Sequence, residues 1–474
     1  IYINSSADGQ LDIVADTEIQ IAATTVDLNG NLDVSGTTVS AGKITADAGI
    51  DIDNINIDGT TIALSSGDLT LDVAGDIILD ADGGDVFLRD AGSEFGRFQG
   101  SSQDLLIRND TQDKDISFVG NDGGVTTTAL ALDMSAAGAA TFNSSVTSAG
   151  LHSTTAGTSN FIAGVNAGNS IASGGNYNVV VGDEAGTAIT TGDDNVAVGY
   201  SALVANTTGT NNTIIGSLAG DALTVGTRNV AVGKSALSAD TQGSRSVALG
   251  RSALQTQNFT SATDAYNVAV GDLAGFSVTT GTANTLVGGL AGDALTTGSN
   301  NVAIGLSALS TDDVGSRSVA VGSNALESQN TATAANIYNT AVGYGAGAAV
   351  TTGVNNTLIG GLAGDALTTG YNNVSLGYNS LSTEDTGRLC VAIGVGALAT
   401  QNIDADVYNT AVGYNAGTAV TTGTNNTLIG GLAGDAITTG THTTAVGYDA
   451  LTANTTASGN SAFGQSSLKN NTTG

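Results

Sequence analysis

The sequence contains no proline and no tryptophan in 474 residues, and only one cysteine and one methionine. At the usual frequency of about 5%, a chain of this length would hold roughly 24 prolines. Proline removes a ladder hydrogen bond from a strand, so its exclusion is typical of a backbone that pairs along its length. A single cysteine excludes an intrachain disulfide, so stability must come from packing or from oligomerisation.

Basic residues are also scarce. Twelve Lys and Arg stand against 43 Asp and Glu, which gives a formal net charge of −31. This balance disfavours nucleic acid as a partner, because phosphate binding needs clustered Lys and Arg. No run approaches the ~18 consecutive apolar residues of a membrane span, so membrane insertion is not expected. Hydrophobic residues nevertheless make up 41% of the chain, enough to build a core and to argue against disorder.

A repeat of 17 residues organises the C-terminal two thirds of the chain. The glycine that closes the tetrapeptides V-A-V-G and T-L-I-G recurs 17 residues apart in thirteen of seventeen intervals, and the exceptions are 18, 21, 21 and 19. The last three exceptions lie four units apart and add a longer period of 72, marked by Gly250, Gly322 and Gly394. Repeats of this regularity indicate a solenoid.

Each unit contains three apolar or β-branched residues that fit a very short strand, as in Val196–Val198. A second short strand is expected to end at the Thr-Thr-Gly turn, as in residues 190–192. Glycine and β-branched residues are too frequent for helices, and no apolar run keeps a period of 3.6. We therefore predict an all-β fold, a parallel β-solenoid (β-roll) of about 17-residue coils spanning residues 161–474 and stacked at ~4.8 Å per coil.

The strand pattern also bears on assembly. All three strand positions are apolar or Thr in nearly every unit, and successive strand residues point to opposite faces, so both faces are expected to be buried. Gly, Gly, Leu, Leu recurs at one position of each 72-residue block, as in Gly275, Gly292, Leu309 and Leu326, directly after an almost invariant Ala. Small residues at fixed places favour close approach at an oligomer axis. We expect an elongated parallel homo-oligomer.

The N-terminal third is less regular. Residues 1–85 alternate apolar and polar residues, are rich in Asp, and predict a β-rich acidic shaft. Residues 86–134 hold four of the nine phenylalanines and fit a small aromatic-cored β knob, and residues 135–160 resemble a linker. The acidic residues are interpreted as solvated faces that keep a fibre soluble. Divalent-cation binding by Asp ladders is the alternative, although no specific site can be named.

The sequence offers little for catalysis. A glycosidase needs two carboxylates flanking a groove, but the most regular acids occupy one repeat position and fit turn capping: Asp221, Asp293, Asp365 and Asp435. The pairs at 193–194 and 312–313 are interpreted as exposed turn residues. His152 falls in the linker, His442 falls in a turn, and Cys390 replaces an Asn or Ser of other units. We expect no enzyme, no cofactor and no metal site.

Three longer units carry the best candidates for binding. Their extra residues should form loops that project every four coils, roughly 19 Å apart, with tyrosine beside amides that suit stacking and hydrogen bonding to sugars. The alternative is that each tyrosine packs over its own bulge. The candidate receptor-binding residues are Tyr266, Tyr338, Tyr408, Gln257, Asn258, Gln329, Asn330, Gln401 and Asn402.

Two further ladders recur along the units. Asparagines lie four residues before each repeat glycine, and Thr-Thr-Gly turns recur once per unit. Stacked Asn and Thr side chains are expected to satisfy one another along the solenoid. The alternative is an ice-binding array of threonines. This alternative is disfavoured because each threonine pair lies beside a glycine turn and not on a broad strand face.

Residues 339–347 (N-T-A-V-G-Y-G-A-G) and 355–364 (N-N-T-L-I-G-G-L-A-G) show the two forms of the unit. They resemble repeats of bacteriophage tail fibres and related virion appendages. They are also similar, with a longer unit, to the head β-roll of trimeric autotransporter adhesins. Residues 85–98 and 112–118 look like marine phage fibre sequence as well. The motifs specify architecture more closely than function.

The resemblance implies a parallel homotrimer on a virion surface or otherwise outside the cell. Such a structural fibre extends from the particle and contributes to host-surface attachment. Its partners would be other virion tail or baseplate proteins and a glycan or protein receptor of the host. The alternative is a bacterial surface trimeric adhesin stalk or head.

Overall fold

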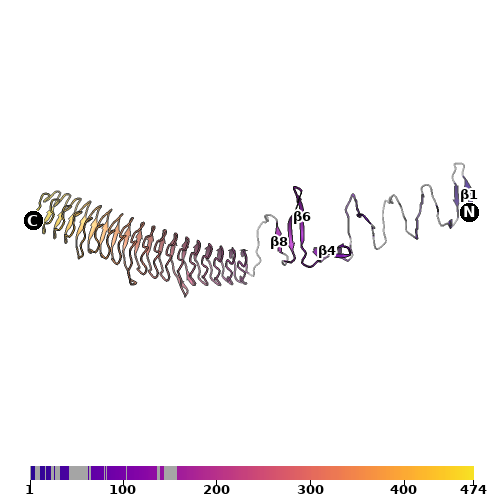
Figure 1. The fold of residues 1–474 in the computed structure, drawn as a ribbon, viewed down its shortest axis with the longest axis horizontal. Coiled ribbons are helices and arrows are strands. Elements are labelled where there is room, and N and C mark those ends of the chain that lie inside the picture. The colour runs from indigo at the N-terminus through magenta and orange to yellow at the C-terminus, as the bar shows by residue number, and fades with distance from the viewer. Residues whose placement is uncertain are drawn as a thin grey trace. The chain divides into compact units, whose positions relative to one another are not determined.

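The computed structural model describes residues 2–5, 11–15, 18–22, 26, 32–41, 62, 64, 66–79, 81, 83–102, 104–135, 139–142 and 157–473. These residues form strands and turns, and none of them belongs to a helix. The chain divides into two compact units, Ile1–Ser144 and Ser145–Gly474 (Figure 1). Nearly half of the predicted shaft and most of the predicted linker lie outside the described residues, and so does His152.

The second unit is a parallel β-solenoid with 18 three-residue strands, one in each coil of its described part. They are β9 (Phe161–Ala163), β10 (Val179–Val181), β11 (Val196–Val198), β12 (Thr213–Ile215), β13 (Val230–Val232), β15 (Val247–Leu249), β17 (Val268–Val270), β18 (Thr285–Val287), β19 (Val302–Ile304), β20 (Val319–Val321), β21 (Thr340–Val342), β22 (Thr357–Ile359), β23 (Val374–Leu376), β24 (Val391–Ile393), β25 (Thr410–Val412), β26 (Thr427–Ile429), β27 (Thr444–Val446) and β28 (Ser461–Phe463).

Every strand pairs in register with the strand of the next coil. Thr340, Ala341 and Val342 of β21, for example, face Thr357, Leu358 and Ile359 of β22. The predicted solenoid of about 17 residues per coil is thereby confirmed. Two further bridging strands, β14 (Gly243–Ser244) and β16 (Thr263–Asp264), pair with each other beside the first long coil.

Turns occupy the stretch where a second strand was expected in each coil of the described solenoid, and the short pair β14 and β16 is the exception. Each strand ends at the repeat glycine, which we call the corner glycine. Gly343, for instance, has φ +138, and a Cβ there would lie 2.5 Å from the carbonyl carbon of Gly360. Left-handed residues follow, such as Leu309 and Leu326 with φ 55 and 50. Repeated positive φ values interrupt the extended backbone, so most coils form only one strand.

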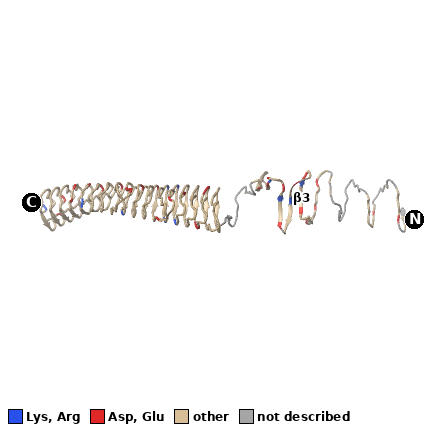
Figure 2. Cartoon of the chain, turned by 90° about the horizontal axis from the view of Figure 1, so that it is seen from below, with Lys and Arg blue, Asp and Glu red and all other residues tan. Residues whose placement is uncertain are grey.

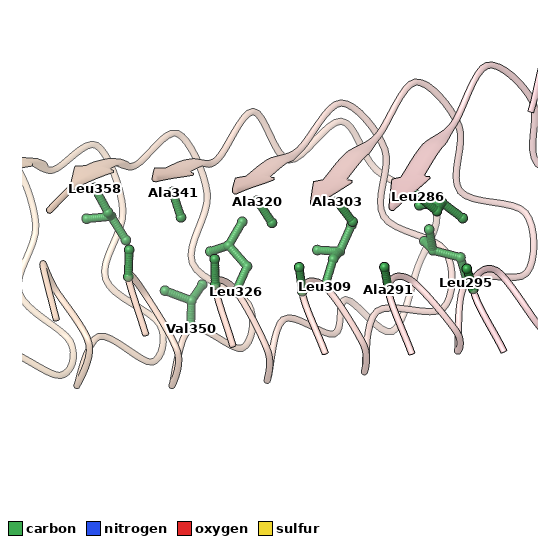
Figure 3. Close-up of a cluster of buried hydrophobic side chains, with 14 of the residues drawn as sticks. Leu286, Ala291, Leu295, Ala303, Leu309, Ala320, Leu326, Ala341, Val350 and Leu358 are labelled. Atoms are coloured by element: carbon green, nitrogen blue, oxygen red, sulfur yellow. The ribbon is translucent and has the colours of Figure 1, made fainter. Parts of the chain in front are cut away.

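The core runs along the inside of the solenoid and is filled by alternating large and small side chains (Figure 3). Leu286 is the central residue of β18, and a Cβ at Gly292 in the same coil would lie 2.8 Å from its Cδ2. The next coil reverses this arrangement, with Ala303 on the strand and Leu309 opposite. Complementary volumes thus keep the interior packed from one coil to the next.

This packing corrects one prediction. The row of alanines and the Gly-Gly-Leu-Leu row were expected at an oligomer axis. Ala308, Leu309, Ala325 and Leu326 are instead fully buried within the single chain. The alanines leave room in the narrow interior for the leucines, so that each level holds one or two bulky residues.

The outward strand residues remain partly exposed. The first and third residues of β21 are half-buried, whereas the central Ala341 is completely buried. Third-position residues Ile304, Leu376 and Ile429 are more exposed still. The chain by itself therefore buries only the inner face of the strands, and the outer face stays an aliphatic stripe.

The first unit contains a hairpin and two three-stranded antiparallel sheets. The hairpin is β1 (Tyr2–Ser5) with β2 (Leu11–Val14). The two sheets are β3 (Asp85–Asp90), β4 (Ser93–Ser101) and β5 (Asp104–Asn109), then β6 (Ile116–Asp122), β7 (Val125–Asp133) and β8 (Ala139–Phe142). Across the first sheet, Arg97 pairs with Asp85 at 2.9 Å and with Asp110 at 3.1 Å.

The aromatic core expected for residues 86–134 is not formed by this chain. Phe87, Phe95, Phe98 and Phe118 are each between 42% and 48% exposed. Each short antiparallel sheet lacks a second layer among the described residues of its unit, so the phenyl rings have little within the chain to pack against.

Candidate functional site

The three tyrosines of the long coils lie on the surface at one repeat position. Tyr266, Tyr338 and Tyr408 are each about half exposed. All three have positive φ, between 52 and 56, at the turn position that carries Asn300 in a shorter coil. Asn tolerates the left-handed region well, so tyrosine is an unusual occupant of this turn.

An arginine of the preceding coil accompanies two of these rings. The guanidinium of Arg245 lies 5.5 Å from the Tyr266 ring centroid, and its Nε lies 3.0 Å from Oδ1 of Asp264. Arg317 lies 5.6 Å from the ring of Tyr338 and donates a hydrogen bond of 2.6 Å to its hydroxyl. The first two long coils thus present an exposed arginine beside an exposed tyrosine, an arrangement that favours cation–π contact.

The third long coil differs. Arg388 pairs with Asp406 and lies 5.4 Å from the ring of Tyr371, which belongs to the preceding coil. Tyr408 contacts Asp406 at 3.5 Å. The ring of Tyr408 therefore has no arginine stacked on it, and Arg388 reaches this site only through its ion pair with Asp406.

The glutamines do not belong to this surface, which corrects the prediction. Gln257, Gln329 and Gln401 are completely buried. Gln257 Nε2 donates to Oδ2 of Asp240 at 2.6 Å and to Oγ of Ser246 at 2.9 Å. Its Oε1 accepts from Nδ2 of Asn267 at 2.9 Å. The glutamine is a structural residue of the interior.

The same network recurs in the other two long coils. Gln329 bridges Asp312, Ser318 and Asn339 at 2.5, 2.9 and 3.0 Å. Gln401 bridges Glu384, Cys390 and Asn409 at 2.9, 3.0 and 2.8 Å. Of the predicted amides, Asn330 and Asn402 remain exposed and Asn258 is partly buried.

The networks repair gaps in the asparagine ladder. In regular coils each ladder residue bonds to the one before it, as when the Asn212 backbone N–H donates to Oδ1 of Asn195 at 3.1 Å. The Asn212 side chain also donates to the carbonyl of Gly226 at 2.9 Å. Where Ser246, Ser318 or Cys390 interrupts the ladder, the glutamine supplies the missing amide.

The threonine hydroxyls also form hydrogen bonds from one coil to the next. Oγ1 of Thr190 donates to the carbonyl of Thr207 at 3.0 Å, and Oγ1 of Thr224 donates to that of Thr241 at 2.8 Å. The expected Asn and Thr ladders are therefore present, but the threonines bond to backbone carbonyls of the next coil rather than to asparagine.

Buried carboxylates are the feature that sequence reasoning missed. Asp312, expected in an exposed turn, is completely buried, as are Asp240 and Glu384. Burial raises the pKa of Asp240 and of Asp312 above the ordinary value for a carboxyl. A signal was present, because the residue before each Thr-Thr-Gly position runs Val278, Leu295, Asp312, Gln329 through the 72-residue block.

The remaining candidates do not form a catalytic constellation. Asp221, Asp293, Asp365 and Asp435 recur four coils apart, and desolvation raises the pKa of each carboxyl. His442 is exposed, and its Nδ1 lies 3.1 Å from Oγ1 of Thr441. Burial raises the pKa of the Cys390 thiol to about 12, so it is not a nucleophile at neutral pH.

Within the described part of the chain, no three His, Cys, Asp or Glu side chains come together as a metal site. In the same part, no helix has the length and apolarity of a membrane span. Acidic residues are scattered along the solenoid with few basic residues among them (Figure 2). No family model, no curated protein and no solved structure matches this chain.

Proposed function

We propose that this chain is a non-enzymatic structural fibre of a virion, a tail fibre or similar appendage that contributes to host-surface attachment. The observation that supports this is the unbroken stack of 18 in-register coils. At ~4.8 Å per coil the stack spans roughly 85 Å. Because each coil pairs only with its neighbours, adding repeats adds length without a new core, as a spacer requires.

The proposed assembly is a parallel homotrimer. The outer strand face is an aliphatic stripe of Val, Ile, Leu and Thr that the single chain leaves half exposed. Contiguous apolar surface of this kind is typical of an interface. Two further copies in parallel register would cover the stripe along its whole length. Native mass spectrometry of the purified chain should give three times the chain mass of 46.3 kDa, and a stable monomer would contradict the proposal.

The proposed partners are other virion tail or baseplate proteins and a glycan or protein receptor on the host surface. The exposed Tyr266, Tyr338 and Tyr408 would present three contacts per chain at intervals of roughly 19 Å. Tyrosine beside arginine or amides suits sugar stacking with hydrogen bonds. The proposed location is the virion surface or the extracellular space.

Adsorption to host cells tests the attachment role. The triple variant Tyr266→Ala, Tyr338→Ala, Tyr408→Ala should adsorb at least about tenfold more weakly. Tyr177→Ala is the matched control, because Tyr177 has the same positive-φ position in a short coil and is equally exposed. Unchanged adsorption of the triple variant would remove these loops from the proposal.

A bacterial surface trimeric adhesin is the second candidate, favoured by the N-T-A-V-G form of the unit at β21 and β25. Immunogold labelling separates the two. Label on particles in a phage lysate supports the fibre, and label on intact uninfected bacteria supports the adhesin.

A further inference from the structure

A second set of tyrosines lies outside the long coils, in a row that follows the corner glycines. We call it the corner row, defined as the residue directly after the corner glycine in the last ten coils. It consists of Leu306, Ser323, Tyr344, Gly361, Tyr378, Val395, Tyr414, Gly431, Tyr448 and Gln465. None of these residues is charged, and tyrosine occupies every second coil from Tyr344 to Tyr448.

The row is regular because the backbone is laddered at this position. The carbonyls of Tyr344, Tyr378 and Tyr414 each accept a hydrogen bond from the following coil, at 2.9, 3.0 and 2.8 Å. Each step along the row is therefore one coil. Successive tyrosines lie two coils apart, which is about 10 Å.

The tyrosine rings are largely exposed, by 67%, 58%, 61% and 55% in chain order. Glycine makes room between two of the pairs. A Cβ atom added at Gly361 would lie 3.5 Å from Cδ2 of Tyr378, and one at Gly431 would lie 3.4 Å from Cδ2 of Tyr448. One edge of each of these rings thus lies along the surface beside a glycine.

Uncharged hydrogen-bonding groups accompany two of the rings, whereas Asp449, paired with Lys469, directly follows Tyr448. Asn379 and Asn415 directly follow Tyr378 and Tyr414 and are partly exposed. The N-terminal half of the solenoid is different, because Lys234, Arg251 and Asp272 occupy the equivalent positions there. The uncharged aromatic row is confined to the C-terminal half.

We propose that the corner row from Tyr344 to Tyr448 binds a linear, uncharged β-1,4-linked polysaccharide that lies along the solenoid axis. In such a chain every second sugar presents the same face, and the length of two extended sugar units is close to two coil spacings. A tyrosine at every second coil can therefore stack on every second sugar, while the asparagines bond to hydroxyl groups.

The net negative charge of the chain argues against an acidic polysaccharide as the ligand. The chain carries a net charge of −31, which repels acidic polysaccharides, and the corner row has no cation to hold them. The row belongs to the turn after the strand, whereas the proposed trimer interface uses the strand residues. The site depends neither on a virion nor on the loops at Tyr266, Tyr338 and Tyr408.

Retention of the purified full chain on insoluble polysaccharides tests the proposal. Cellulose, chitin and β-mannan are the probes, and granular starch, whose glucose units are α-1,4-linked, is the control. The chain should be retained on at least one β-1,4-linked probe and not on starch. Tyr378→Ala with Tyr414→Ala should weaken retention by about tenfold per ring. The triple variant of the long-coil tyrosines should bind as the wild type does.

A positional swap tests the spacing itself. The double variant Tyr378→Gly with Gly361→Tyr keeps the number of tyrosines but moves one ring by a single coil. Gly361 has no positive φ, and its one close side-chain neighbour is the ring that the swap removes, so the fold should tolerate the change. Binding should fall at least about tenfold with an unchanged unfolding midpoint. Wild-type binding by the swap, retention on starch, or no retention on any β-1,4-linked probe would overturn the proposal.

Discussion

The side-chain amide of Gln329 lies 2.9 Å from Oγ of Ser318 and takes the place of the amide that the asparagine ladder lacks there. The same nitrogen lies 2.5 Å from Oδ2 of Asp312, which is completely buried. The longer coils therefore carry a buried polar network as well as an exposed loop. Buried polar groups of this kind are costly unless every partner is present.

Removing the glutamine should destabilise the solenoid. Gln329→Ala leaves the Asp312 carboxylate and the Asn339 amide each without one buried partner, so the unfolding free energy should fall by at least about 2 kcal/mol. Urea unfolding followed by circular dichroism measures this. Asn330→Ala, at the adjacent exposed position, is the control and should stay within about 0.5 kcal/mol. Equal effects of the two substitutions would contradict the network.

Mild acid should stabilise the wild type relative to a variant without the buried carboxyls. Burial raises the pKa of Asp240 and Asp312, so between the unfolded and folded pKa values the folded chain binds more protons. Their contribution to the unfolding free energy is therefore greatest below the unfolded pKa of about 3.9 and falls as pH rises through the folded pKa.

Thermal unfolding of the wild type and of Asp240→Asn with Asp312→Asn, at about pH 4 and about pH 7, measures this effect. The difference in midpoint between wild type and variant should shift in favour of the wild type at the lower pH. Asp194→Asn, at an exposed turn, is the control for an Asp-to-Asn substitution outside the buried networks. A double variant with the profile of the wild type would show that these carboxyls do not titrate differently on folding.

Substitution by alanine should destabilise the chain at one of two glycines in adjacent coils and should be nearly neutral at the other. At Gly343, φ is +138 and a Cβ would lie 2.5 Å from the backbone of Gly360, so Gly343→Ala should cost about 2 kcal/mol or more. At Gly361 the nearest contact of a Cβ is an ordinary 3.5 Å to a tyrosine ring, so Gly361→Ala should be nearly neutral. Urea unfolding compares them, and similar losses for both would refute the close packing of the corner glycines.

The thiol of Cys390 should not react with thiol reagents in the folded chain. Its pKa of about 12 leaves almost no thiolate at neutral pH, and the residue is completely buried. Labelling with a thiol reagent should therefore follow unfolding rather than precede it. Cys390→Ser should change the unfolding free energy by less than about 1 kcal/mol, since Ser246 and Ser318 make the equivalent contact to glutamine. Rapid labelling of the native chain would be inconsistent with this burial.

Local pattern was enough to predict the strands. Val196–Val198 and its counterparts are runs of β-branched or small residues closed by glycine, which is the local signature of a short strand. The spacing of the corner glycines then required one coil per unit. The absent second strand was not predicted, because left-handed φ values at residues such as Leu309 are not a property of leucine but of the coil that surrounds it.

The candidate site was only half predictable. Tyr266, Tyr338 and Tyr408 were correctly predicted to be exposed, although the reason is their turn position directly before the ladder residue, which leaves Tyr177 exposed in a short coil as well. The burial of Gln257 depends on Asp240, seventeen residues earlier in the preceding coil. Neither residue reveals this pairing by itself, because it arises only when the two coils stack.

Periodicity along the chain determined the solenoid, its coil length and its all-β character, since those follow from short-range backbone preferences repeated at a constant interval. The stacked structure alone decided which side of each strand is buried, where the small residues lie, and that Asp240, Asp312 and Glu384 sit inside. Burial is a property of neighbouring coils taken together. An aspartate is solvated in one coil and buried in another, depending on which residues of the next coil cover it.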